Sequence, residues 1–356
     1  MVAPATASQQ LDMTAIRLTV EDALFAFLQQ KESGPDGPLL GKMFDVLREF
    51  LGGGGKRVRP LYCCLGWSSV ANAPIDSTVL RAAAGLELFH TFALVHDDLI
   101  DGSERRHDRP TAHRVFAAHG PQERAAWFGE SAAVLLGDLC EVWAAELLGG
   151  LGGGAEQAVV RGILDRMRGE LVLGQYLDLL ASGDDCGSVD SALRVIHYKT
   201  TKYTVERPMQ IGAALAGAGP AHLDACAAYA RPLGEAFQMY DDLEDVVVGG
   251  SGAGTDGGDL REGKHTVVLA LAMRHARPEA AERLRKLVGD SSLSEQDLAE
   301  ARALIAATGA PDMVKRMVLE RRQQALTILE GAPFHPVAKE ALRRLTDLAV
   351  PGVRQW

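Results

Sequence analysis

The sequence has little of the chemistry that marks secreted, membrane-spanning or nucleic-acid-binding proteins. Its five cysteines are scattered and form no C-x-x-C pair, which argues against a zinc site and a disulfide framework. Residues 1–10 lack the features of a secretory signal, so we expect a cytoplasmic protein. The most apolar stretches, such as 131–148, contain acidic residues, so we expect no stable membrane insertion. The formal net charge of −10 disfavours a nucleic-acid partner.

The alternation of β-branched and polar residues that is typical of strands is nearly absent. Apolar residues instead recur at spacings of three and four, as in Leu80, Ala84 and Leu88, which predicts an all-α fold. Glycine clusters at 52–55, 149–154 and 249–258 interrupt this pattern. Because the flanking segments remain apolar, we interpret the clusters as loops between helices. We expect a disordered segment over residues 1–12 and one helical domain over 13–356.

Two aspartate-rich clusters, D-D-L-I-D at 97–101 and D-D-L-E-D at 241–245, lie inside apolar, helix-patterned segments. A helix brings residues four apart onto one face, so Asp97 and Asp101 project together, as do Asp241 and Asp245. Carboxylates so close together repel unless a cation lies between them, and Mg²⁺ shared with substrate phosphates is the simplest candidate. The clusters lie 241 − 97 = 144 positions apart, which suits helices that face each other across one bundle.

Basic residues occur in four further segments. Each segment alone could be a solvated helix face or, at 52–60, a glycine linker. Beside two acidic clusters, however, they favour two diphosphate substrates, one of them bridged by Mg²⁺, because guanidinium and ammonium groups suit phosphate oxygens. The segments are G-G-G-G-K-R-V-R-P at 52–60, the adjacent pair Arg105 and Arg106, Y-K-T-T-K-Y at 198–203 with Lys199 and Lys202, and D-L-R-E-G-K at 259–264.

In this combination the motifs resemble the trans-isoprenyl diphosphate synthases, or polyprenyl synthetases, over roughly residues 50–271, and most resemble bacterial geranylgeranyl diphosphate synthases. The resemblance implies an all-α bundle of the isoprenoid synthase type I fold, usually a homodimer, with the two aspartate motifs facing each other across a deep central cavity. It also implies a prenyltransferase that condenses isopentenyl diphosphate head-to-tail with an allylic diphosphate, with three Mg²⁺ ions per active site.

The resemblance assigns roles to individual residues. Asp97, Asp101 and Asp241 match the Mg²⁺ ligands. The residues implied in catalysis are Asp97, Asp98, Asp101, Arg105, Lys199, Asp241 and Asp242. Those implied in substrate binding are Lys56, Arg59, His90, Arg105, Arg106, Lys199, Thr200, Gln238 and Lys264. Among these, the resemblance assigns Arg105 to the allylic diphosphate, and it assigns to isopentenyl diphosphate Lys56, Arg59, His90 and Arg106. Gln175 and Asp178 match a further motif on an inner helix.

The chain departs from the family pattern at two positions. Gly254 stands where the family usually has a loop lysine, and Glu244 stands where an apolar residue is more common. Both changes concern substrate affinity more than the chemistry.

Phe92 and Ala93 occupy the positions that set product length in the family. An aromatic residue followed by a small one, with no insertion in the first aspartate motif, resembles the C20 (geranylgeranyl) pattern, and a C15 (farnesyl) product is the alternative. Other readings are a class I terpene cyclase, a non-catalytic prenyl synthase subunit, and a di-iron bundle built on the E-x-x-H pairs at Glu87 and Glu104. The second D-D-x-x-D cluster argues against the cyclase.

Overall fold

A computed structural model of the chain describes residues 11–53, 56–106, 109–182, 188–247, 257–290 and 292–350. The first half contains α1 (Met13–Glu32), the 3-10 turn η1 (Gly37–Leu40), α2 (Gly41–Gly52), α3 (Val58–Val70), α4 (Ser77–Ile100), α5 (Ala112–His119), the 3-10 turn η2 (Gln122–Arg124), α6 (Ala125–Leu148) and α7 (Gly154–Ala181). The second half contains α8 (Val189–Val195), the π-helix η3 (Ile196–Glu206), α9 (Arg207–Leu215), α10 (Pro220–Val247), α11 (Gly258–Glu262), α12 (Val267–His275), α13 (Pro278–Leu287), α14 (Glu295–Ala307), α15 (Ala310–Gly331) and α16 (Pro336–Ala349).

The prediction of an all-α fold is confirmed. The exception among the described residues is a small antiparallel pair, β1 (Arg105–Arg106) and β2 (Arg109–Pro110), which the sequence did not reveal. The glycine cluster at 149–154 separates α6 from α7, as expected for a loop. Most of the cluster at 249–258, including Gly254, lies outside the described residues, and so do residues 1–10. Asp12 caps α1: its side chain accepts hydrogen bonds from the backbone of the first turn.

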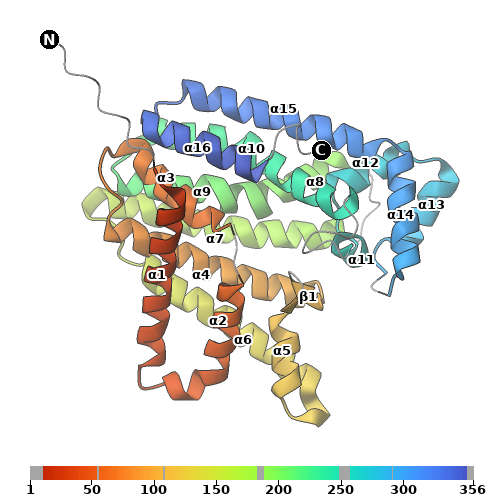
Figure 1. Cartoon of the computed structure of the whole chain (residues 1–356), viewed down its shortest axis with the longest axis horizontal. Helices are drawn as coiled ribbons and strands as arrows, with labels where there is room; N and C mark the ends of the chain where they lie inside the picture. The colour runs from red at the N-terminus through yellow and green to blue at the C-terminus, as the bar shows by residue number, and fades with distance from the viewer. Residues whose placement is uncertain are drawn as a thin grey trace.

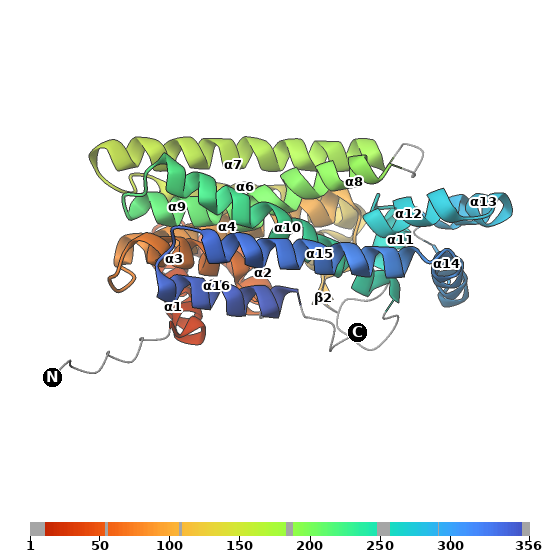
Figure 2. The ribbon, with the colours of Figure 1, turned by 90° about the horizontal axis from the view of Figure 1, so that it is seen from above.

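The long helices lie roughly side by side and form the body of the molecule, as Figure 1 shows for α4, α7, α10 and α15. Seen from above, α7 forms one long side, α15 and α16 form the other, and α10 runs between them (Figure 2). The red and orange α1 and α2 project from the body in Figure 1, and the blue α13 and α14 lie at the opposite end. A cluster of buried apolar side chains extends from Ile16 to Val350.

Helix α4 is the central element of the first half. Asp76 caps its N-terminus with a side-chain oxygen that accepts from the backbone of Thr78 and Val79. By length and composition α4 could cross a membrane, although the sequence analysis expected no such segment, but 61% of its apolar window is buried inside the molecule. It packs against α3 and α6 and carries the first aspartate cluster at its C-terminal end. Its apolar character is therefore explained by its position in the core.

Candidate active site

A cavity of about 1350 Å³ opens between the two halves of the chain. Helices α4, α7 and α10, the π-helix η3, and the segments around β1 and α11 all contribute to its wall. Every described residue assigned above to catalysis, substrate binding or chain length lines the cavity except Asp101, which lies at its edge against Lys264. The structure therefore brings together side chains that are up to 208 positions apart (264 − 56).

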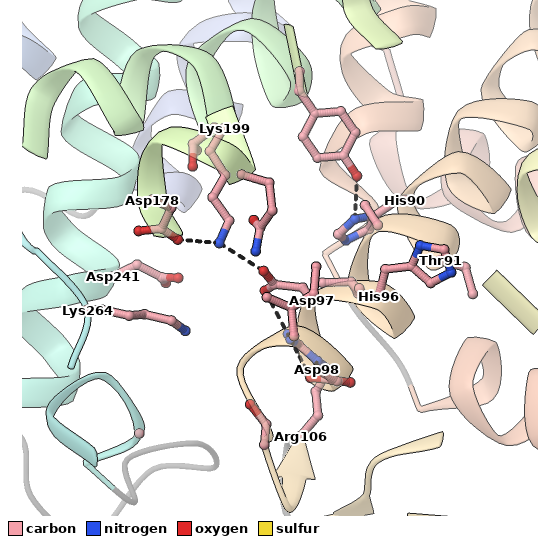
Figure 3. A pocket seen from close by; sticks show the side chains of 18 of the residues that line it. His90, Thr91, His96, Asp97, Asp98, Arg106, Asp178, Lys199, Asp241 and Lys264 are labelled. Atoms are coloured by element: carbon pink, nitrogen blue, oxygen red, sulfur yellow. Dashed lines mark hydrogen bonds and ion pairs between the residues drawn. The ribbon is translucent and has the colours of Figure 1, made fainter. Parts of the chain in front are cut away.

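The two aspartate clusters face the same space, with two lysines between them (Figure 3). The Nζ of Lys199 lies 2.9 Å from an oxygen of Asp97 and 2.6 Å from an oxygen of Asp178. Burial opposes the charge on Lys199, but these two carboxylates outweigh it and raise its pKa above the ordinary value. Asp97 and Asp178 thus hold Lys199 in its charged form.

Lys264 is the second cation between the clusters. Its Nζ lies 2.6 Å from Glu262, 3.5 Å from Asp259 and 3.6 Å from Asp101. Burial would lower the pKa of Lys264, but these neighbours raise it well above the usual range. The pKa of Asp97 falls below its ordinary value because the charges of Lys199 and Lys264 outweigh the effect of burial. Lys264 thereby links the end of α4 to the segment that follows α11.

The lysines do not neutralise the whole cluster. Burial and the nearby charge of Asp97 raise the pKa of Asp101 to about 6. Loss of solvent at the cavity wall raises the pKa of Asp241 to about 6, although Lys56 acts in the opposite direction. Burial and repulsion from Asp259 raise the pKa of Asp245 to about 6 as well. The cavity therefore retains an excess of negative charge that a bound cation would relieve.

The donor set fits Mg²⁺. No group of three or more His, Cys, Asp or Glu side chains is arranged to hold a metal within the described ranges. Mg²⁺, however, usually keeps several waters and takes only one or two carboxylates together with substrate phosphates, so it needs no closed protein cage. Asp97 and Asp241 provide carboxylate oxygens from opposite sides of the cavity, and Asp101 lies at its edge against Lys264. The di-iron alternative is disfavoured because Glu87, which would have to be an iron ligand, forms an ion pair with Arg57 at 2.5 Å. His107, the histidine of the second E-x-x-H pair, lies outside the described residues.

Asp98 and Asp242 have a different environment from the other aspartates. Asp98 is 1% exposed and accepts two hydrogen bonds from Arg106, at 2.8 Å from Nε and 2.7 Å from a terminal nitrogen. Asp242 is buried and accepts from Gln238 at 2.7 Å, and Gln238 in turn accepts from Thr200 at 2.8 Å. Asp98 therefore anchors the hairpin arginine, and Asp242 joins α10 to the π-helix. Arg105 is exposed on the same hairpin.

Lys199 reaches Asp97 because of the π-helix. A Cβ added to Gly174 on α7 would lie 2.5 Å from the backbone nitrogen of Lys199, so α7 and η3 touch along their backbones here. On an ordinary α-helix, Lys199 and Lys202 would share one face, because residues three apart are neighbours. In the structure Lys202 instead pairs with Glu206 at 2.8 Å, outside the cavity wall. The wider π-helical turn separates the two lysines, consistent with the frequent location of such turns at functional sites.

A second group of side chains lies beside the aspartate clusters, around Tyr203, which the sequence analysis did not select. The hydroxyl of Tyr203 bonds to Nδ1 of His90 at 2.6 Å, and its ring lies 4.3 Å from the guanidinium of Arg59. Arg59 also donates to Thr204 at 2.8 Å. Burial raises the pKa of Tyr203, so its hydroxyl stays protonated. Tyr203 thus connects two of the groups assigned to isopentenyl binding.

The buried side chain of Arg57 supports the same region. The sequence alone offers no reason to assign a role to Arg57. It is the one residue other than glycine, among those described, with a positive φ, at 46°. Its buried guanidinium pairs with Glu87 at 2.5 Å and Glu21 at 3.2 Å, and it also donates to the carbonyl of Leu51. Such a strained backbone persists only when its surroundings hold it in place. These contacts fix the segment that carries Lys56 and Arg59. Gly54 and Gly55, which precede Lys56 in the glycine segment, lie outside the described residues.

Comparison with known proteins agrees with this geometry. A family model described as polyprenyl synthetase matches residues 41–305. The octaprenyl diphosphate synthase of Escherichia coli (strain K12) is 31% identical over 301 residues, which cover 84% of this chain and 86% of that protein. Geranylgeranyl pyrophosphate synthase 11, chloroplastic, of Arabidopsis thaliana is 32% identical and covers 70% of this chain and 68% of that protein.

Solved structures agree as well. A geranylgeranyl pyrophosphate synthase from Corynebacterium glutamicum, complexed with isoprenyl diphosphate and magnesium, superposes with a TM-score of 0.89 at 35% identity, covering 96% of this chain and 99% of that chain. A polyprenyl synthase from Caulobacter crescentus, complexed with calcium and isoprenyl diphosphate, superposes with a TM-score of 0.78 at 28% identity, covering 98% of this chain and 99% of that chain.

An all-α bundle whose cavity joins two aspartate clusters and several cations is the architecture of an isoprenoid synthase. The chain belongs to the polyprenyl synthetase family. It is a prenyltransferase of the isoprenyl diphosphate synthase class, as the resemblance predicted.

The raised pKa values near 6 predict how metal binding depends on pH. Asp101, Asp241 and Asp245 bind protons more tightly in the folded chain than in the unfolded one. Their stabilising contribution is thus present at low pH and lost as pH rises through about 6, where the ionised carboxylates repel. We expect MgCl₂ to raise the melting temperature of the metal-free protein at about pH 7.5 much more than at about pH 5. Thermal denaturation measures this change in melting temperature, with the EDTA-treated protein as the baseline. If Mg²⁺ raised the melting temperature equally at both pH values, these carboxylates would not be the groups that control metal binding.

Proposed function

We propose that the enzyme condenses isopentenyl diphosphate with an allylic diphosphate and that its main product is C20 geranylgeranyl diphosphate. The observation that carries the reaction is the pairing of two opposed aspartate clusters with cations in one cavity. Support for the product length comes from Phe92 in the cavity wall and from the likeness to the geranylgeranyl pyrophosphate synthase of Corynebacterium glutamicum. A C15 product is the alternative, and relatives named as octaprenyl and nonaprenyl synthases make longer products worth testing.

We assign Asp97, Asp101 and Asp241 to hold Mg²⁺, with three ions expected per active site. These carboxylates would hold Mg²⁺, which would supply positive charge to the departing allylic diphosphate. Lys199, Lys264 and Arg105 donate to the oxygens of the same diphosphate and stabilise the charge that develops as the allylic C–O bond breaks. Lys199 and Lys264 already lie among these carboxylates, so they need only exchange carboxylate partners for phosphate oxygens.

The remaining basic groups orient the second substrate. Lys56, Arg59, His90 and Arg106 hold isopentenyl diphosphate so that its double bond faces the allylic cation. The new C–C bond forms with the two electrons of that double bond, and a proton from the adjacent carbon passes to the released diphosphate. The protein therefore needs no nucleophilic side chain.

Incubation of the purified protein with isopentenyl diphosphate, Mg²⁺ and each of the C5, C10 and C15 allylic diphosphates tests the reaction. We expect chain extension by the protein alone. Asp241→Ala should lower kcat about 100-fold or more, because a group that stabilises leaving-group charge is lost. Asp224→Ala on the exposed part of the same helix is the matched control and should retain activity. A cyclic hydrocarbon made without consumption of isopentenyl diphosphate would indicate a terpene cyclase, and no product at all would indicate a non-catalytic subunit.

The side chain of Phe92 should limit product length. Its ring packs 5.4 Å from that of Phe89 and 4.8 Å from that of His96, and it lines the cavity. Phe92→Ala would open that part of the wall, so we expect products longer than those of the wild type by at least one isoprene unit. Chromatography of dephosphorylated, radiolabelled products measures the distribution. An unchanged distribution would refute the assignment.

We also propose that the protein is a homodimer in the cytoplasm. Exposed apolar side chains on two helices support the dimer: Val134, Leu135 and Val142 on α6, and Val172, Leu173, Tyr176, Leu179 and Leu180 on α7. The unpaired buried thiols of Cys63, Cys64, Cys140 and Cys226 are consistent with a reducing compartment. Light scattering should give the mass of two chains, and Leu135→Lys with Val142→Lys, which lie outside the cavity wall, should lower it to one; a monomeric wild type contradicts the proposal.

A further inference from the structure

Helix α4 carries, between the chain-length residue Phe92 and the ligand Asp97, a histidine that has no assigned role. His96 lies one turn after Phe92 on the same face, and its imidazole meets the phenyl ring edge-on at 4.8 Å. Figure 3 shows the imidazole on the opposite side of α4 from Lys199 and Asp241. His96 is therefore placed to act on the apolar wall of the cavity and not on the diphosphates.

The imidazole of His96 is itself fixed by α6. Its Nε2 lies 3.1 Å from the carbonyl oxygen of Val134, which can only accept, so Nε2 carries a proton and donates it. The same nitrogen is 3.9 Å from Asp138. The hydrogen bond to the backbone of α6 thus holds the ring between α4 and α6, with the carboxylate of Asp138 nearby.

Gly137 on α6 provides the space for this ring. A Cβ added at Gly137 would lie 2.2 Å from Nε2 of His96 and 2.3 Å from Cδ2, so the imidazole would have to move. Gly137 is buried, and none of the described residues that line the cavity belongs to α6. His96 itself lines the cavity beside Phe92, so its imidazole lies between the cavity and the backbone of α6 at Gly137.

We propose that His96 is a specificity-determining residue: it holds the ring of Phe92 in the cavity wall, and Gly137 sets its position. With the imidazole in place, Phe92 has aromatic neighbours at 4.8 Å and 5.4 Å, and it cannot turn toward α6 because His96 fills that space. Without the imidazole, the ring of Phe92 can rotate into the vacated volume and the cavity deepens. The inference rests on the proposed chain elongation, since it concerns where elongation stops.

His96→Ala should lengthen the main product by at least one isoprene unit while the rate of the first condensation stays within about twofold of the wild type. His96→Gln keeps an N–H donor for the Val134 carbonyl but has no ring against Phe92, so it should lengthen the product as well. This second variant keeps the test decisive if His96→Ala folds poorly. His119→Ala, an exposed histidine on α5, is the control and should leave the product unchanged.

Gly137→Ala gives a readout that does not depend on catalysis. The new methyl group displaces the imidazole, so the melting temperature should fall and the product should lengthen. In the double variant His96→Ala with Gly137→Ala the clash is gone, so the melting temperature should recover relative to Gly137→Ala alone. Gly169→Ala on α7, where an added Cβ meets nothing within 4 Å, controls for the substitution itself.

The outcomes separate this inference from the proposed function. A wild-type protein that forms no prenyl chain refutes the proposed function. A wild-type protein that elongates, but whose His96→Ala and His96→Gln variants give the wild-type distribution while Phe92→Ala gives longer products, overturns the role of His96 alone.

Discussion

The structure depends on holding two clusters of carboxylates against each other's repulsion. Asp97 near the end of α4 faces the same cavity as Asp241 and Asp245 in α10, and Asp101 lies at its edge. Lys199 and Lys264 compensate only part of this charge. Carboxylates so placed destabilise the folded chain unless other contacts offset them. Here the offset comes from apolar packing behind each helix: α4 lies against α3 and α6, and α10 lies against α15.

The same constraint explains why the cations come from separate segments. If the lysines were on the aspartate helices themselves, the charge would be neutralised locally and little would remain for a metal or a diphosphate. Because Lys199 belongs to the π-helix and Lys264 follows α11, each can exchange its carboxylate partner while the helices stay in place. The cavity thus keeps enough negative charge to attract a cation, and the packing of the helices holds the carboxylates in place without one.

Much of the fold and site could be predicted from local patterns. Helices were predictable because buried residues repeat with the helical period, as in Val79, Ala82, Leu86 and Phe89 along α4. The candidate site residues were selected from the two aspartate clusters, the basic segments and the resemblance to a known family, and the structure places them in or beside one cavity. Tyr203 was not selected, because its role depends on contact with His90, 113 positions away. The π-helix and the left-handed Arg57 were not predicted either, since both are imposed by tertiary contacts that no local pattern encodes.

Helix α4 joins the chemistry of the cavity to its size. Phe92 and Asp97 are five residues apart, so they are about 140° apart around the helix and roughly 7.5 Å apart along it. The two side chains therefore face different walls of the cavity, and the volume near Phe92 can change without moving the carboxylate of Asp97. Asp97 is fixed by Lys199 from η3, whereas Phe92 is fixed by rings on α4 itself. This separation of contacts allows the apolar wall of the cavity to differ in size while the carboxylate of Asp97 stays in place.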